Sequence, residues 1–219
     1  MEYVKFKNGE EPLPIGKIIG VGRNYAAHAK ELGNEVPDEF PLIFMKNVSG
    51  LLHSGGEIIH PTYSTELHHE VELVLVIGKD IKDADNESAE DAIYGYGVGF
   101  DMTLRDLQFS LKKKGEPWTL AKCFDGAAVI SDFITKNEYK LKGNEAISLK
   151  VNGETRQNST LDKMLFDSIS IIKFLSSKMK LEKGDLIFTG TPEGVGKVVK
   201  GDLLEGEIEN IASLKATIG

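Results

Sequence analysis

The stretch LHHEVELVLVI, residues 67–77, has the two-residue period of a β-strand, in which alternate side chains point to opposite faces. One face is apolar almost throughout and carries Leu67, His69, Val71, Leu73, Leu75 and Ile77. The other face begins with His68, Glu70 and Glu72 and ends with Val74 and Val76. If both faces are buried, two neighbouring carboxylates need compensation, because removing like charges from water is costly. A divalent cation would supply it; the alternative is an edge strand whose second face begins in water.

A second strand pattern, YGYGVGFDMT at residues 94–103, brings a third carboxylate into the argument. One face carries Tyr94, Tyr96, Val98 and Phe100, and the other carries Gly95, Gly97 and Gly99, followed by Asp101. Glycines on one face of a strand indicate the close approach of another backbone or of a ligand. Together with Glu70 and Glu72, Asp101 would form a three-carboxylate site suited to Mg²⁺, Mn²⁺ or Ca²⁺. Zinc fits less well, because it prefers Cys and His, and the single cysteine lies elsewhere.

The composition predicts a soluble globular protein. The 219 residues are 41% hydrophobic and 27% charged, which suits one domain with an ample core. The 26 basic and 34 acidic residues give a net charge of −8, which argues against nucleic acid or an anionic membrane as partner. One cysteine excludes an internal disulfide and favours a reducing cytoplasm. Because no apolar run has the length of a signal-peptide core or a membrane span, we expect a cytoplasmic protein.

The rest of the chain predicts an α+β fold that is predominantly β. Short strands are expected over residues 2–8, 17–22, 42–45, 57–60, 147–151, 154–157, 186–188 and 205–218. Helices are expected over residues 25–32, 87–93, 103–114 and 168–178. Asn24 is the expected cap of the first helix, Asn86 or Ser88 that of the second, and Asn152-Gly153 the turn of a hairpin.

Several side chains near these elements are candidates for catalysis. His28 and Glu31 are three residues apart on a predicted helix and can touch, as in a general base oriented by a carboxylate. The alternative is a solvent-facing pair on a short, mobile helix. Arg105 and Gln108 lie one turn apart, close in sequence to the predicted metal site. Lys122 would offer a positive charge to an oxyanion.

Three other segments have different expected roles. The polar loop at 35–40 and the short helix before it are candidates for a flap. The segment TGTPEGVG, residues 189–196, lacks the lysine of a phosphate loop, so we expect a tight loop whose Thr hydroxyls and amides hold a small carboxylate. Cys123 has apolar neighbours and no marked His partner, so it is expected to pack rather than to act as a nucleophile.

Five segments together resemble the fumarylacetoacetate hydrolase family: VGRNYAAHAKE, LHHEVEL, GYGVGFDMTLRDLQ, KGEPWTLAK and GDLIFTGTPEGVG. The chain is most similar to the short, single-domain branch of acylpyruvases and fumarylpyruvate hydrolases. The resemblance runs in order from about residue 17 to the C-terminus, which leaves residues 1–16 as a short N-terminal extension of a single domain over 1–219. It implies a mixed β-sandwich roll with a few short helices, assembled as a homodimer.

The resemblance also implies roles for individual residues. The metal ligands would be Glu70, Glu72 and Asp101, the lid dyad His28 and Glu31, the substrate-contacting lysine Lys122, and further substrate contacts Arg23, Arg105, Gln108 and Thr191. Two departures are seen: Asn47 follows Lys46 where many members have proline, and residues 126–129 differ from the usual sequence. Both concern the edges of the pocket and so affect substrate identity more than chemistry.

The implied function is a Mg²⁺-dependent hydrolase that cleaves the C–C bond of 3-acylpyruvates of the acetylpyruvate or fumarylpyruvate type. In that reaction His28 activates the water, and Lys122 stabilises a pyruvate enolate together with the metal. The alternative for this small 2-oxo acid site is oxaloacetate decarboxylation or tautomerisation, or isomerisation of a hydroxymuconate-type diacid, by the same enolate chemistry. A non-catalytic metal- or ligand-binding scaffold is the hypothesis from a different class.

Overall fold

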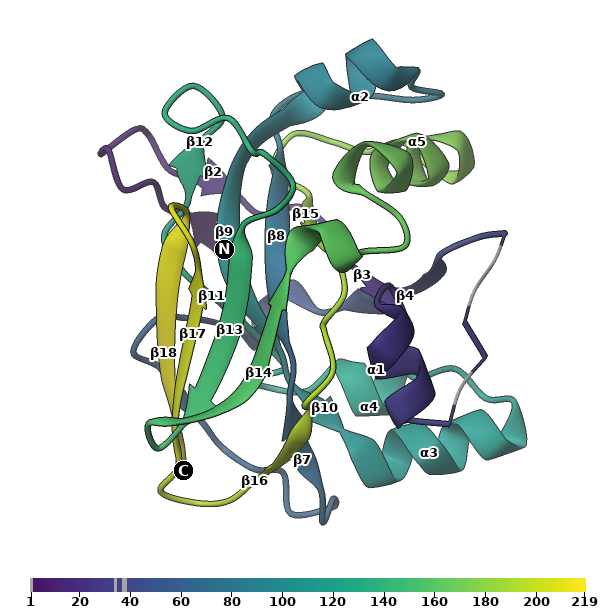
Figure 1. The fold of residues 1–219 in the computed structure, drawn as a ribbon, viewed down its shortest axis with the longest axis vertical. Coiled ribbons are helices and arrows are strands. Elements are labelled where there is room, and N and C mark those ends of the chain that lie inside the picture. Colours follow the sequence, from purple (N-terminus) through teal and green to yellow (C-terminus); the bar gives the residue numbers. More distant parts are fainter. Residues whose placement is uncertain (1, 34, 37–38) are drawn as a thin grey trace.

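The computed structural model describes residues 2–33, 35–36 and 39–219, and these residues form mostly β-strands with a few short helices (Figure 1). The helices are α1 (Ala26–Glu31), α2 (Asn86–Ala92), α3 (Arg105–Lys114), α4 (Thr119–Lys122) and α5 (Ser168–Lys178), with 3-10 turns at η1 (Val48–Gly50) and η2 (Leu161–Lys163). The predicted flap loop at 35–40 includes residues 37 and 38, which lie outside the described residues. None of the helices in the described part of the chain is long and apolar enough to span a membrane.

The strands form two large sheets and two small ones. The strands are β1 (Tyr3–Val4), β2 (Leu13–Pro14), β3 (Ile18–Gly22), β4 (Leu42–Lys46), β5 (Leu51–His53), β6 (Glu57–Ile58), β7 (Leu67–His69), β8 (Val71–Ile77), β9 (Ile93–Asp101), β10 (Thr103–Leu104), β11 (Ala128–Ile130), β12 (Ile134–Thr135), β13 (Ala146–Val151), β14 (Glu154–Thr160), β15 (Leu186–Phe188), β16 (Gly196–Val198), β17 (Leu203–Ile208) and β18 (Ala212–Ile218). One large sheet has the order β4-β3-β15-β8-β9-β11-β5, with β12 beside β9, and the other has the order β14-β13-β17-β18-β6. The two large sheets lie against each other, with β13 in contact with β8, and β17 and β18 in contact with β9 (Figure 1).

Strand β8 lies inside its sheet and is buried on both faces. It pairs antiparallel with β15 on one edge and with β9 on the other. Leu73, Leu75 and Ile77 belong to the larger core cluster, which includes residues of the second sheet. Val74 and Val76 face a smaller cluster. The edge-strand alternative is therefore wrong, and the carboxylates that precede Val74 lie in the protein interior.

The three glycines of β9 make room for the protein's own core. A Cβ atom added at Gly97 would lie 2.7 Å from the ring of Phe133, and one at Gly99 would lie 2.4 Å from the ring of Phe188. A Cβ atom at Gly95 would lie 2.3 Å from the carbonyl oxygen of Ile134. The predicted close approach of another backbone is thus found at Gly95. At Gly97 and Gly99 the close neighbours are aromatic side chains, which the prediction did not include.

Some predicted boundaries are confirmed and others are wrong. The helix over 168–178, the strand over 186–188 and the hairpin turn at Asn152-Gly153 are all found. The predicted strand over 67–77 is interrupted at Glu70, which separates β7 from β8. The helix predicted from residue 103 begins at Arg105, because the two residues before it pair with β7 as strand β10.

The predicted helix caps are also corrected. Asn24 does not cap α1; its side chain donates to the carbonyls of Phe166 and Thr189 and accepts from the Phe166 amide. Helix α2 is capped by Asp85, which accepts a hydrogen bond from the Ser88 amide. In the first case a long-range contact takes the side chain that local sequence had assigned to a helix end.

Candidate active site

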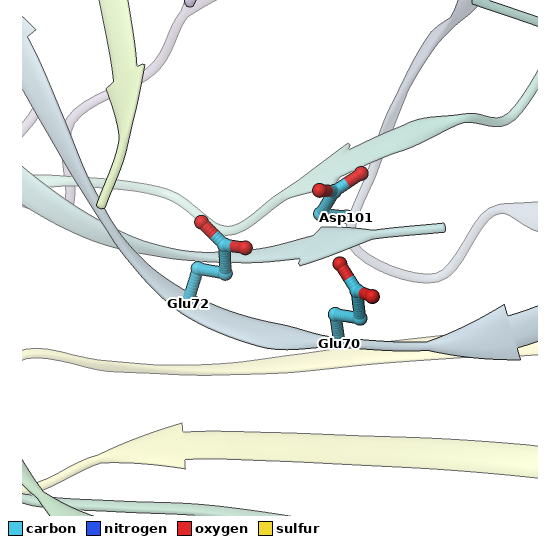
Figure 2. Close-up of side chains that lie close together, drawn as sticks. All are labelled: Glu70, Glu72 and Asp101. Carbon is cyan, nitrogen blue, oxygen red and sulfur yellow. The ribbon is translucent and has the colours of Figure 1, made fainter. Parts of the chain in front are cut away.

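Three buried carboxylates meet where β7, β8 and β9 come together (Figure 2). Glu70 lies at the break between β7 and β8, Glu72 follows on β8, and Asp101 ends β9. The pairing of β8 with β9 places Glu72 opposite Gly99, and the Asp101 amide donates to the Glu70 carbonyl at 2.9 Å. Carboxylate oxygens of the three residues lie within 4.8 Å of one another. We call Glu70, Glu72 and Asp101 the carboxylate triad.

Three cationic side chains surround two members of the triad. The ammonium of Lys122 donates to Glu70 Oε2 at 2.9 Å, to Asp101 Oδ2 at 2.6 Å and to the Thr103 hydroxyl at 2.6 Å. The Arg105 guanidinium pairs with Oε1 of Glu70. Lys46 donates to Asp101 Oδ1 at 2.5 Å. These contacts neutralise much of the negative charge of Glu70 and Asp101.

Glu72 is held differently. It accepts a hydrogen bond from the Gly190 amide at 2.7 Å and has no ion pair within the described residues. Burial raises the pKa of Glu72 well above its usual value, and the charges of Asp101 and Glu70 raise it further. Burial alone would also raise the pKa of Glu70, but Lys122 and Arg105 bring it well below its usual value. The charged form of Glu72 is therefore disfavoured unless a further cation lies beside it.

The triad fits a divalent metal ion. Its ligands are hard carboxylate oxygens from three residues within reach of one another, the donor set that Mg²⁺, Mn²⁺ and Ca²⁺ prefer. A cation placed among them would offset the charge of Glu72, which no protein cation pairs with in the described part of the chain. The residues present thus suit a divalent cation without any change of side chain.

A pocket of about 660 Å³, its open mouth included, lies over the triad. It is lined by Val21, Gly22, Arg23, His28, Leu32, Phe44, Glu70, Glu72, Asp101, Arg105, Gln108, Phe109, Lys112, Trp118, Lys122 and Thr191. Nine of the ten side chains singled out from the sequence are in this lining. The tenth, Glu31, contacts His28. The structure thus brings together residues that are up to 168 positions apart, from Arg23 to Thr191.

His28 and Glu31 form a hydrogen-bonded pair on α1. Nδ1 of His28 lies 3.4 Å from Oε2 of Glu31, and His28 is only 6% exposed. The solvent-facing alternative for this pair therefore does not hold for the imidazole. The Glu31 carboxylate also accepts from the Gly194 amide at 3.1 and 3.2 Å, which ties α1 to the loop after β15. A carboxylate at Nδ1 favours the tautomer with hydrogen on Nδ1, which leaves Nε2 as the basic atom.

Arg23 and Arg105 line the pocket in different states. Arg23 follows β3 with φ +58, in the left-handed region that non-glycine residues rarely adopt. Its Nε atom is buried and has no hydrogen-bond partner within the described residues. Arg105 is already engaged, because it pairs with Glu70 and donates to Gln108 Oε1 at 2.5 Å. Of these two arginines, Arg23 is therefore the one with an unpaired donor among the described residues, and that Nε atom is buried.

The prediction that the Thr hydroxyls of the loop at 189–196 are free to bind a carboxylate is wrong. Thr189 donates from its hydroxyl to the Leu73 carbonyl at 3.0 Å, and Thr191 donates to the Val71 carbonyl at 2.8 Å. The loop continues the direction of β15, which pairs with β8, so its hydroxyls satisfy carbonyl groups of β8. Thr191 lines the pocket, but its hydroxyl hydrogen is already used.

The structure adds residues in the pocket lining, Phe44 and Trp118, and beside it, Lys46, to which the sequence had given no role in the site. Lys46 is fully buried against Asp101, and Phe44, two residues earlier on β4, places its ring centroid 4.6 Å from the Lys122 ammonium. The ring of Trp118 lies 6.1 Å from that of Phe44. For Lys46, the signal available in the sequence was its place at the end of an apolar strand, residues 42–46. Cys123 donates to the Met45 carbonyl, and burial raises the pKa of its thiol, which agrees with a packing role.

Comparison with known proteins gives one consistent result. The sequence profile described as "Fumarylacetoacetate (FAA) hydrolase C-terminal" matches residues 17–219. An oxaloacetate tautomerase of Arabidopsis thaliana is 48% identical over 199 residues, which cover 91% of this chain and 89% of that protein. An oxaloacetate decarboxylase of Dictyostelium discoideum is 47% identical over 190 residues, covering 86% and 87%.

A solved structure shows the same fold. It is the fumarylpyruvate hydrolase of Pseudomonas aeruginosa in complex with Mn²⁺ and pyruvate, with a TM-score of 0.95 and 36% identity over 99% of this chain and 95% of that one. The predicted α+β, mostly β fold with a few short helices is thereby confirmed.

Proposed function

The chain belongs to the fumarylacetoacetate hydrolase family, and on this premise we propose that it is an enolate-forming enzyme that tautomerises oxaloacetate or a closely similar 2-oxo diacid. Decarboxylation of the same substrate is the related outcome of the same chemistry. The observation that carries the proposal is the buried carboxylate triad with the Lys122 ammonium against it, at the floor of a pocket. The curated relatives named for oxaloacetate chemistry support the choice of substrate.

Charge balance in the pocket favours a dicarboxylate. The three carboxylates of the triad are matched by three cationic side chains, those of Lys46, Lys122 and Arg105. A bound divalent cation would leave an excess of two positive charges near the substrate, and the Arg23 guanidinium in the pocket lining adds a third. A dianion offsets more of this excess than a monoanion does, and charge interactions are stronger where water is excluded.

We propose Mg²⁺ as the resident cation, with Mn²⁺ and Ca²⁺ as alternatives, held by Glu70, Glu72 and Asp101. When bound, it supplies Lewis-acid stabilisation of an enolate. The Arg23 guanidinium belongs to a residue of the pocket lining and is suited to a substrate carboxylate.

The side chains around the pocket can perform the proton transfers of a keto–enol tautomerisation. Nε2 of His28 takes the proton from C3 of the substrate, while Glu31 holds the imidazole through Nδ1. Negative charge develops on the C2 oxygen, and the proton taken up by the His28 imidazole is returned to this oxygen to complete the enol. Burial would lower the pKa of Lys122, but Asp101 and Glu70 raise it above its usual value, so the lysine stays charged and stabilises the oxyanion.

Hydrolysis of a 3-acylpyruvate is the second candidate. The His28–Glu31 pair at the pocket and the structural similarity to a fumarylpyruvate hydrolase favour it. In this reaction His28 takes a proton from water, and the water oxygen bonds to the acyl carbon. The bond between that carbon and C3 then breaks, which yields a carboxylic acid and pyruvate after protonation.

The test follows the ultraviolet absorbance of enol oxaloacetate as it converts to the keto form. Parallel samples contain Mg²⁺ with protein, Mg²⁺ alone, and protein with EDTA, because divalent cations accelerate enolisation without protein. Acceleration that needs both protein and Mg²⁺ supports the proposal. Release of pyruvate from acetylpyruvate without oxaloacetate turnover favours the hydrolase. Metal binding without either reaction favours a non-catalytic scaffold.

The single domain, the homodimer and the cytoplasmic location stay predictions.

A further inference from the structure

Gln157 is a fully buried polar residue between the two large sheets that the proposed chemistry does not use. It lies on β14 with no solvent exposure, whereas its neighbours Arg156 and Asn158 are exposed. Its Oε1 atom lies 3.0 Å from the Val71 amide and 3.1 Å from Nδ1 of His69. Its Nε2 atom lies 2.8 Å from the Thr191 hydroxyl and 2.8 Å from the Pro192 carbonyl. The side chain thus makes four hydrogen bonds, all to residues at least 34 positions away.

Two backbone partners fix the orientation of this amide. The Val71 N–H can only donate, so the atom facing it is the oxygen, and the Pro192 carbonyl can only accept, so the atom facing it is the nitrogen. It follows that His69 carries a hydrogen on Nδ1 and donates it to Gln157. The Thr191 hydroxyl accepts from Gln157 and passes its own hydrogen to the Val71 carbonyl. Both hydrogens and both lone pairs of the amide are therefore used.

The partners of Gln157 lie next to the carboxylate triad. His69 and Val71 are the residues on either side of Glu70, at the break between β7 and β8. Thr191 and Pro192 directly follow Gly190, whose amide is the donor to Glu72. One side chain thus joins the segment that carries Glu70 to the loop that holds Glu72 and lines the pocket. Gln157 itself is not part of the pocket lining.

We propose that Gln157 is a positioning residue, which holds the backbone around Glu70 and the loop around Thr191 in the geometry needed to bind the metal and the 2-oxo acid. The alternative is a purely structural role, in which Gln157 only stabilises the hairpin of β13 and β14. These two roles differ in their consequences. A hairpin role predicts that any equally destabilising change nearby affects the site in the same way, whereas a positioning role predicts an effect specific to the four hydrogen bonds.

The test compares Gln157→Met, which keeps the length of the side chain and loses the hydrogen bonds, with a matched change at Leu149. Leu149 pairs directly with Gln157 across the hairpin and is fully buried, but it belongs to the apolar core. Leu149→Val or Leu149→Ala is chosen to give the same loss of Tm. We expect Gln157→Met to weaken Mn²⁺ binding by about tenfold or more, the usual effect of losing support behind a metal ligand. The Leu149 variant should bind Mn²⁺ within about twofold of wild type, since it leaves that support intact. Wild-type Mn²⁺ affinity in Gln157→Met would overturn the proposal. An equal loss of Mn²⁺ affinity in Gln157→Met and in the Leu149 variant would also overturn it.

A second measurement covers the case in which Gln157→Met does not fold. Gln157→Glu keeps an oxygen for Val71 and His69 but loses the amide donor to Thr191. It is combined with Thr191→Val in a double-mutant cycle, read out as pyruvate affinity of the Mn²⁺-loaded protein. Coupling predicts that the double variant binds pyruvate little more weakly than the weaker single variant. Additive losses contradict a role through Thr191. The proposal rests on the triad as a metal site, not on the reaction: if wild type fails to turn over oxaloacetate, the proposed function falls, whereas the Mn²⁺ affinities still decide the role of Gln157.

Discussion

The ammonium of Lys46 and the carboxylate of Asp101 form an ion pair from which solvent is excluded, with both side chains fully buried. The other oxygen of Asp101 accepts from Lys122, so this carboxylate lies between two ammonium groups from β4 and α4. Lys46 also donates to the carbonyl of Lys122 at 3.0 Å, which ties the end of α4 to the same centre. Lys46 thus fixes the position of a proposed metal ligand and of a proposed catalytic lysine together.

Lys46→Met is expected to destabilise the metal-free protein. Removing one of the two ammonium groups beside Asp101 leaves Lys122 as its remaining ion-pair partner, so we expect a cost of about 3 kcal/mol or less in the free energy of unfolding. Mn²⁺ should recover part of this loss, because a cation at the triad compensates Asp101. Urea unfolding in EDTA and in Mn²⁺ measures both effects. Lys79→Met is the matched control, since Lys79 forms an exposed ion pair with Asp91 and should matter little in either buffer. An equal loss from Lys46→Met with and without Mn²⁺ would contradict the assignment.

Glu72→Gln is expected to make the metal-free protein more stable at neutral pH. Burial, Asp101 and Glu70 raise the pKa of Glu72, so the folded state binds this proton more tightly than the unfolded state does. The charged form therefore destabilises wild type above the folded-state pKa, and the penalty disappears as the pH falls toward the unfolded value of about 4.3. The stability advantage of the variant in EDTA should shrink over that range.

Free energies of unfolding in EDTA, measured at several pH values, check the sign. With Mn²⁺ present the order should reverse, because the cation binds wild type far more tightly than a variant that lacks one carboxylate. A difference between wild type and Glu72→Gln that does not change with pH would count against the raised pKa.

His28→Ala is expected to lower kcat by about 10² to 10⁴, the scale for loss of a general base, while the affinity for Mn²⁺ stays unchanged. Glu31→Gln should cause a smaller loss of about tenfold, since the imidazole keeps its place but loses an oriented carboxylate partner. Steady-state kinetics together with Mn²⁺ titration separate these effects. Undiminished turnover in His28→Ala would rule out its role as base.

Gly97→Ala is expected to destabilise the fold by about 1–3 kcal/mol through overpacking. The new methyl group would lie 2.7 Å from the ring of Phe133, inside the smaller core cluster. A lower urea midpoint with an unchanged m-value is the expected result. Adding Phe133→Leu should recover part of the loss by making room. If the double variant is less stable than Gly97→Ala by the full cost of Phe133→Leu alone, the two positions do not interact.

Local patterns in the sequence were sufficient for several elements. The alternation in residues 67–77 and 94–103 predicted strands and brought Glu70, Glu72 and Asp101 forward as one candidate site, while burial of the first strand was left open. Asn152-Gly153 predicted a tight hairpin turn, and both residues have the positive φ that such a turn requires, +52 and +81. In each case the signal lies within a few residues, where the geometry of the chain fixes which side chains share a face.

The tertiary structure alone decided which distant groups meet. Asn24, predicted as a helix cap, hydrogen-bonds residues 142 and 165 positions away, and the Thr189 and Thr191 hydroxyls go to carbonyls of β8. Local periodicity in the sequence does not predict the ion pair of Lys46 with Asp101. It does not predict the hydrogen bond of Gln157 with the Val71 amide beside Glu70 either. The order and register of the strands set these contacts, and a buried polar group takes whichever partner that packing provides, because leaving it unpaired is costly. The sequence by itself determined the strands and the acidic residues of the site, and the packing of the two sheets determined the charges and hydrogen bonds that hold those residues in place.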